Sequence, residues 1–415
     1  MRHRRRLAAG LAVVLCVLPG CSVDDPPLRP PAVAGPTMEQ PTVDRPAVEA
    51  PPAARPLFAV RAAVDLSPAV PGGAATAAAA VASPDGGAYV VLSTPDHDLP
   101  HYLATVARTG SGYAVTGSVP IPRLRPVWDV HVLANGRVLI SGQFRGDRPG
   151  YGFLSVDPAR GKVRRAEVIP FEEGTELASG ASVLSPDGET ITLFLSSFTD
   201  GRRLDLLMSA DVSNGRIRGG RDLSEEMRTV SETGVGPWST WLFARPDGEV
   251  VLVFDAYPPG VGIDGVPTLL RYDAALEPVG RPVPAAGVAD AARLRAAAVA
   301  PDGTVVVRVE VPDGTRLIEL SPVGTSSTRR LDLPGPADDD ELVVDPAQGW
   351  ALVPAVGGAR AVDLTSGGSA PVDVGCTPGV DRLLPGSGGG SVLMLGRCGP
   401  RGGQIPTLWI TGPAQ

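Results

Sequence analysis

One short turn sequence recurs along most of the chain, and it limits the possible folds more than any other feature. In it, proline presets φ at the second position of a type I turn, aspartate suits the third, and glycine takes the left-handed conformation that follows. Such turns close β-hairpins, and the short Val-rich runs beside them are typical of strands. The clearest copies are Ser83-Pro84-Asp85-Gly86, Ser185-Pro186-Asp187-Gly188, Arg245-Pro246-Asp247-Gly248 and Ala300-Pro301-Asp302-Gly303.

The spacing of these turns predicts the architecture. The turn glycines from Gly86 to Gly349 follow one another at intervals of 46 to 60 residues, and a weaker seventh turn lies at 386–390. Each turn is followed by further strand-like segments, such as 103–107 and 113–121. A repeat of this length with four strands is typical of propeller blades. We therefore expect an all-β, seven-bladed β-propeller over residues 57–415.

The two ends of the repeat region predict how the ring closes. The last unit ends in its third strand, at 407–411, and has no fourth. The segment 58–66 reads as a strand without a partner of its own. If it forms the outer strand of blade 7, the ring is sealed and an exposed sheet edge is removed.

The tandem hairpins with Ser-Pro-Asp-Gly turns resemble the repeats of TolB-like and YVTN-like bacterial propellers, and this resemblance covers residues 58–411. It implies a fold and leaves the function open, because one fold carries many functions. The Trp-Asp pair that marks WD40 repeats occurs here as a single pair, Trp128-Asp129, on an expected inner strand.

The N-terminus has the features of an export signal. Arginines in the first six residues precede an apolar run at 7–18, which is too short to span a bilayer. The following Leu18-Pro19-Gly20-Cys21 resembles a bacterial lipobox. That resemblance implies a signal peptide over 1–20 and a lipid on Cys21, which would hold the protein on the extracytoplasmic side of the cell membrane. Plain secretion with an unmodified Cys21 is the alternative.

Residues 21–56 are rich in proline, which favours an extended chain. Either this segment is a disordered tether that holds the propeller away from the membrane, or it is a leader with no length requirement. Of the 37 Lys and Arg residues only Lys162 is a lysine, which suggests the codon usage of a GC-rich, actinobacterial genome.

Charge argues against one class of partner. The chain carries a net charge of −8, and loss of the four arginines in 1–20 leaves 33 basic against 45 acidic residues, or −12. An acidic protein with a pI near 5.2 is not expected to bind nucleic acid. We expect a monomer whose partners are the membrane, through the lipid, and a protein or glycan.

Two cysteines remain besides Cys16 and Cys21. Cys376 and Cys398 are expected in two loops of blade 7 that share one face, and an oxidising compartment favours a disulfide between them. Two free thiols are the alternative.

Candidate site residues gather in the loops opposite the Pro-Asp-Gly turns, on the face that we name the top. Loops on a rigid scaffold carry function more often than the scaffold itself. The imidazoles and carboxylates of one such loop suit a divalent metal, and an acidic run at the channel mouth suits Ca²⁺, the one cofactor that the sequence suggests. Two tryptophans near the top of inner strands suit stacking on sugars. The candidates are Asp96, His97, Asp98, His101, Trp128, Asp129, His131, Trp238, Asp338, Asp339 and Asp340.

Each candidate has a structural alternative: a solvated polar loop, an acidic linker, or packing between blades. No familiar catalytic motif is present in the sequence. Two function classes stay open. The first is a non-catalytic binding or protein-interaction module. The second is an extracellular enzyme, either a glycan hydrolase or lyase using two top-face carboxylates, or a quinone-dependent dehydrogenase with His131 near its cofactor.

Overall fold

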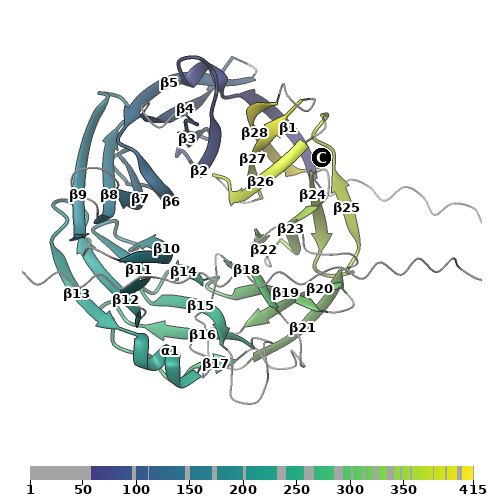
Figure 1. Ribbon diagram of the computed structural model, residues 1–415. Coiled ribbons are helices and arrows are strands. Elements are labelled where there is room, and N and C mark those ends of the chain that lie inside the picture. The colour runs from purple at the N-terminus through teal and green to yellow at the C-terminus, as the bar shows by residue number, and fades with distance from the viewer. Residues whose placement is uncertain are drawn as a thin grey trace, which may run out of the picture. The chain divides into compact units, whose positions relative to one another are not determined.

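Seven four-stranded antiparallel sheets stand around a common axis in the computed structural model (Figure 1). Residues 54–415 belong to one compact unit. The prediction of an all-β, seven-bladed propeller is confirmed. The structure describes residues 58–95, 100–110, 112–144, 150–170, 175–199, 202–230, 240–256, 266–284, 293–300, 302–311, 314–320, 326–333, 341–345, 348–355, 358–376, 378–387, 390–399 and 404–414.

Within blades 1 to 6, the strands follow one another in chain order from the inside outwards. Blade 1 comprises β2 (Thr76–Ala82), β3 (Ala88–Ser93), β4 (His101–Thr109) and β5 (Gly112–Ile121). Blade 2 comprises β6 (Leu124–Val132), β7 (Val138–Phe144), β8 (Gly150–Asp157) and β9 (Lys162–Pro170). Blade 3 comprises β10 (Glu176–Leu184), β11 (Thr190–Thr199), β12 (Arg202–Asp211) and β13 (Ile217–Asp222). Blade 4 comprises β14 (Thr240–Ala244), β15 (Val250–Ala256), β16 (Val266–Tyr272) and β17 (Val283–Pro284).

Blade 5 comprises β18 (Arg293–Val299), β19 (Val305–Val311), β20 (Gly314–Leu320) and β21 (Ser326–Leu333). Blade 6 comprises β22 (Val343–Asp345), β23 (Trp350–Ala355), β24 (Gly358–Asp363) and β25 (Ser369–Val372). Blade 7 comprises β26 (Pro378–Pro385), β27 (Val392–Cys398), β28 (Ile405–Pro413) and, as its outer strand, β1 (Phe58–Asp65).

The described chain also contains a short helix that the repeat did not predict, α1 (Ser224–Val230), and a single 3₁₀ turn, η1 (Ser67–Ala69). No helix in this part of the chain has the length and apolar character needed to cross a bilayer.

The inner strands close a ring. Each contacts the next around the axis, in the order β2, β6, β10, β14, β18, β22, β26 and back to β2. The alanines at 77–80 and 296–298, in β2 and β18, suit these crowded positions, because small side chains let the strands converge. The hydrophobic core lies between the blades, and one cluster joins Val91 and Leu103 of blade 1 to Val130 and Ile140 of blade 2.

The N-terminal strand closes the ring as predicted. β1 pairs antiparallel with β28, from Phe58 opposite Pro413 to Asp65 opposite Thr407. The Phe58 ring packs edge-on against Trp350 of blade 6, with 4.7 Å between the ring centroids. The strand thus contributes to the core as well as covering the edge of β28.

The recurring turns have the predicted local geometry. In the first of them Gly86 has φ +87° and its N–H donates to the Ser83 carbonyl at 3.0 Å. Gly248 repeats both features, with φ +88° and a bond of 2.9 Å to the Arg245 carbonyl. These turns join the first and second strands of a blade, at the bottom face. The loops between second and third strands, and those between blades, therefore lie at the top.

A disulfide joins Cys376 and Cys398 across the top of blade 7, as the sequence predicted. Cys376 precedes β26, and Cys398 ends β27 opposite Pro378, which brings the two Cα atoms to 5.9 Å. Both cysteines pack against a core cluster that includes Met394 and Trp409.

Replacing both cysteines by serine should lower the free energy of unfolding by about 3 kcal/mol, because the bond closes a loop of 22 residues in the unfolded chain. Denaturant unfolding of the Cys376→Ser/Cys398→Ser variant beside the wild type measures this. Reduced wild-type protein is the matched control and should resemble the variant. Two free thiols at these positions in denatured, unreduced protein would show that the bond does not form.

Candidate functional site

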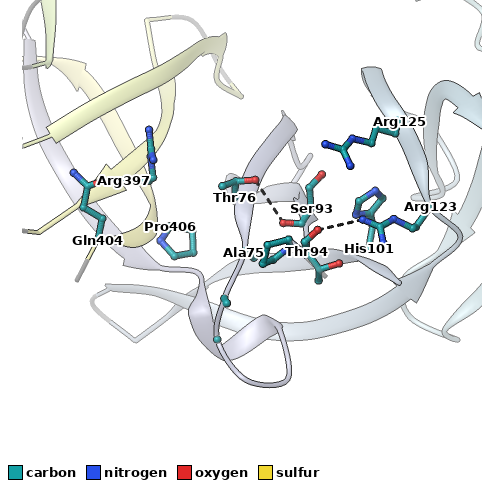
Figure 2. Close-up of a pocket in the computed structure, with 13 residues that line it drawn as sticks. Ala75, Thr76, Ser93, Thr94, His101, Arg123, Arg125, Arg397, Gln404 and Pro406 are labelled. Carbon is teal, nitrogen blue, oxygen red and sulfur yellow. Dashed lines mark hydrogen bonds between the residues drawn. The ribbon is translucent and has the colours of Figure 1, made fainter. Parts of the chain in front are cut away.

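A cavity of about 530 Å³ opens on the top face where blades 7, 1 and 2 meet (Figure 2). The lining comes from the top-face ends of β2, β3, β4, β6, β27 and β28 and from the segments next to these strand ends. The lining residues are Gly73, Ala74, Ala75, Thr76, Ser93, Thr94, Pro95, His101, Arg123, Arg125, Arg397, Gln404 and Pro406.

The cavity is strongly basic for a protein of net charge −8. Three arginines line it, and its described lining includes no aspartate or glutamate. In Figure 2, Arg123 and Arg125 lie on one side together with His101, and Arg397 lies on the other side near Gln404. The Arg125 side chain is exposed, Arg123 is half-buried, and the Arg397 side chain is 46% exposed.

Hydrogen bonds fix the walls between these arginines. A guanidinium nitrogen of Arg123 donates to the Thr94 carbonyl at 3.4 Å, and the Thr94 hydroxyl donates to the Pro100 carbonyl at 3.2 Å. The Thr76 hydroxyl donates to the Ser93 carbonyl at 3.5 Å, which ties the top of β2 to the end of β3. The cavity is therefore held by the strand ends of the propeller.

Among the described lining residues, His101 is the one histidine. It is only 2% exposed, and its Nε2 lies 3.0 Å from the Leu124 carbonyl, to which it donates. Burial lowers the pKa of His101, and the nearby Arg123 charge lowers it further, so the ring is neutral near pH 7. Its Nδ1 then carries a lone pair, and this buried atom has no partner within the described chain.

Several sequence candidates cannot be placed. Cys21, Asp96, His97, Asp98, Trp238, Asp338, Asp339 and Asp340 lie outside the described residues. The metal-loop and channel-mouth hypotheses therefore stay predictions. Within the part of the chain that is described, no three His, Cys, Asp or Glu side chains come close enough together to hold a metal ion.

Trp128 packs between two blades, which is the structural alternative to a sugar-stacking role. We expected a ring near the top of an inner strand, where it could stack on sugars. Instead it is 6% exposed and stacks on Tyr151 of the same blade, with 5.8 Å between ring centroids. Its other neighbour is Gly180 of blade 3, where a Cβ atom would lie 2.2 Å from the indole ring. The ring fills the space between two blades.

Asp129 and His131 belong to a polar network at the same blade junction. An Asp129 carboxylate oxygen accepts the backbone N–H of Ser182 at 2.7 Å, and the His131 Nε2 lies 2.9 Å from the Ser182 hydroxyl. The Ser182 and Ser141 hydroxyls are 2.7 Å apart, and both serines are buried. Burial lowers the pKa of His131. In this arrangement Asp129 binds the neighbouring strand, so the network joins β6 and β7 of blade 2 to β10 of blade 3.

Asp255 makes a similar junction that sequence reasoning missed. It is 4% exposed at the top of β15, and its two oxygens lie 3.1 and 3.0 Å from the Leu294 backbone N–H of blade 5. Burial raises the pKa of Asp255 to about 7, against the opposing effects of the Leu294 hydrogen bond and of Arg293 and Arg295. No sequence signal marks it, because its partner is a backbone group of the next blade.

Asp255 should make stability fall as pH rises from about 4 to about 7. In that interval the unfolded chain releases the proton, which has an ordinary pKa of 3.8 there, while the folded chain keeps it. The Asp255→Asn variant should lack this slope, because the amide does not titrate. The free energies of unfolding of both proteins are measured at several pH values. Between about pH 4 and pH 7, the value for the variant minus that for the wild type should rise by at least about 1 kcal/mol. Parallel pH profiles would contradict the assignment.

Comparisons with known proteins give the fold and no family. No protein-family model matches the chain, and no curated protein sequence matches it. Puromycin hydrolase is similar in structure with a TM-score of 0.56 and 16% identity, over 78% of this chain and 50% of that one. This chain therefore spans half the length of that hydrolase. The Cps50 (Swd1) β-propeller domain of Myceliophteria thermophila has a TM-score of 0.52 and 10% identity, over 82% and 97%. At such identities the similarity shows that the chain is a β-propeller and does not extend to an activity.

Proposed function

We propose that this chain is an extracytoplasmic, membrane-anchored bacterial lipoprotein whose propeller acts as a non-catalytic binding module with its site on the top face. The observation that carries the binding role is the basic cavity between blades 7, 1 and 2. Its volume of about 530 Å³ is within the range of small-molecule sites. The Pro-Asp-Gly turns support a relation to TolB-like and YVTN-like propellers of bacteria, here an actinobacterium.

The chemistry of the cavity favours binding over glycan hydrolysis. A glycosidase generally needs two carboxyl groups that flank the scissile bond. The described lining instead offers three guanidinium groups, which can hold a ligand by charge and hydrogen bonds. The partner in this proposal is a protein or glycan of the cell envelope.

The anchor is tested by detergent-phase partitioning. The wild-type chain should enter the detergent phase, because two acyl chains give stable membrane attachment. The Cys21→Ala variant cannot carry the lipid, so it should leave the membrane unless an uncleaved signal peptide holds it there. Sequencing the N-terminus of each product shows whether the signal peptide was cleaved. A wild-type protein that partitions into the aqueous phase would contradict lipidation.

The binding role is tested with the full chain purified in detergent and immobilised. Envelope extract is passed over the wild type, over Arg125→Glu and over Arg108→Glu. Arg108 is the matched control, because it is also exposed but lies at the other end of β4 from His101. A component should be retained by the wild type and by Arg108→Glu and lost with Arg125→Glu. Equal retention by all three would place binding elsewhere.

A further inference from the structure

Arg125 and Arg397 of the top cavity lack the close ion pair that several other described arginines form. Arg160, Arg203, Arg271 and Arg295 lie 2.9, 2.7, 2.9 and 2.5 Å from a carboxylate oxygen. Arg397 has its nearest carboxylate, Asp381, at 3.7 Å, and both side chains are about half exposed. At that distance and exposure the pair contributes little. Arg125 forms no ion pair within the described chain.

This excess of positive charge is local. Acidic residues outnumber basic ones by 45 to 37 in the whole chain, yet the described lining of the cavity brings three arginines together without a carboxylate. An anion that binds between Arg125 and Arg397 would gain from both positive charges. Asp96 and Asp98, between Pro95 and Pro100, lie outside the described residues and are not counted in this balance.

The positions of the groups suit one kind of ligand. Arg123 and Arg125 stand across the cavity from Arg397 (Figure 2). The planar guanidinium fork binds carboxylate or phosphate oxygens in pairs.

We propose that the cavity binds a ligand through an oxyanion group, a carboxylate or a phosphate, held between Arg125 and Arg397. This inference rests on the proposed function and names the ligand class of the same site. Arg123 adds charge while keeping its bond to the Thr94 carbonyl.

Isothermal titration calorimetry on the full chain in detergent tests the proposal. The probes are trigalacturonate for carboxylate, glycerol 3-phosphate for phosphate, and neutral maltotriose. One of the two anions should bind saturably at one site and maltotriose should not. Added salt should weaken binding, because exposed charges are screened. Which anion binds separates an acidic glycan from a phosphorylated ligand.

Variants then assign the binding to the cavity. Arg125→Ala and Arg397→Ala should each weaken it about tenfold or more, since a hydrogen bond to a charged group is worth roughly 1.5–3 kcal/mol. Arg108→Ala should bind within about twofold of the wild type because it lies at the opposite end of β4. Arg125→Lys should recover only part of the affinity, because lysine keeps the charge and loses the fork. Thermal melts check that each variant is folded.

Two results would overturn the anion assignment: neither anion binds the wild type, or Arg108→Ala weakens binding as much as Arg125→Ala. These results are distinguishable from failure of the proposed function. If an envelope component is still retained by the wild type and lost with Arg125→Glu, the binding role stands and only the ligand class is wrong. If no component is retained either, both fail.

Discussion

A chain that begins at residue 67 should fail to form a monomeric propeller, whereas one that begins at residue 58 should form it. The two differ by β1 and Leu66. Without β1, strand β28 becomes the outer edge of blade 7, and its backbone groups from Thr407 to Pro413 lose their partners. An unpaired edge of this length favours association between chains.

The shorter chain should also lose a large amount of buried apolar surface. Phe58, Val64 and Leu66 are almost fully buried, in the clusters on either side of blade 7. Burying a side chain of this size contributes about 1.5–3 kcal/mol. Their sum of roughly 5–9 kcal/mol approaches the total stability of many proteins, about 5–15 kcal/mol.

Light scattering after size-exclusion chromatography and thermal melting compare the two chains. The longer chain should be a monomer with a cooperative transition, and the shorter should aggregate or melt without cooperativity. A monomeric chain 67–415 that melts within a few degrees of the control would show that the ring is held by its inner strands alone.

Much of the fold could be predicted because its signals are local or follow from closure. The Pro-Asp-Gly turns specify hairpins through the backbone preferences of three residues. The count of strands leaves blade 7 one short, which assigns 58–66 to it. The Cys376–Cys398 pair followed once both cysteines were placed on top of one blade. Helix α1 was not predicted, because it lies in the connection between blades 3 and 4, which the β repeat does not specify. Its local signal is Ser224 followed by Glu225 and Glu226, a typical helix start.

The top cavity could be predicted only in part. The sequence placed its candidates on the top face, where the cavity lies, and His101 is one of the residues that line it. The sequence did not indicate Arg123, Arg125 and Arg397, because they come from different blades: Arg397 lies in β27 of blade 7, Arg123 just before β6, and Arg125 at the start of β6. The closure of the ring brings these segments together. In a chain with so many arginines, their number alone carries no signal.

The Trp128→Ala substitution should cost about 3–5 kcal/mol of stability and leave ligand binding by the folded protein unchanged. The ring is buried between blades 2 and 3, against Tyr151 and Gly180, and its removal leaves a cavity at that junction. Trp128→Phe should cost less, since a ring remains and the indole N–H, which has no partner within the described chain, is removed. Chemical denaturation measures both.

A double-mutant cycle with Gly180 decides whether packing is the cause. Gly180→Ala alone should be destabilising, because its Cβ would lie 2.2 Å from the Trp128 ring. In the Trp128→Ala background the same change should cost little or even stabilise, since the added methyl group enters vacated space. Additive effects would contradict the packing role. A Trp128→Ala protein that keeps its stability and loses binding of a glycan would restore the stacking role that the sequence suggested.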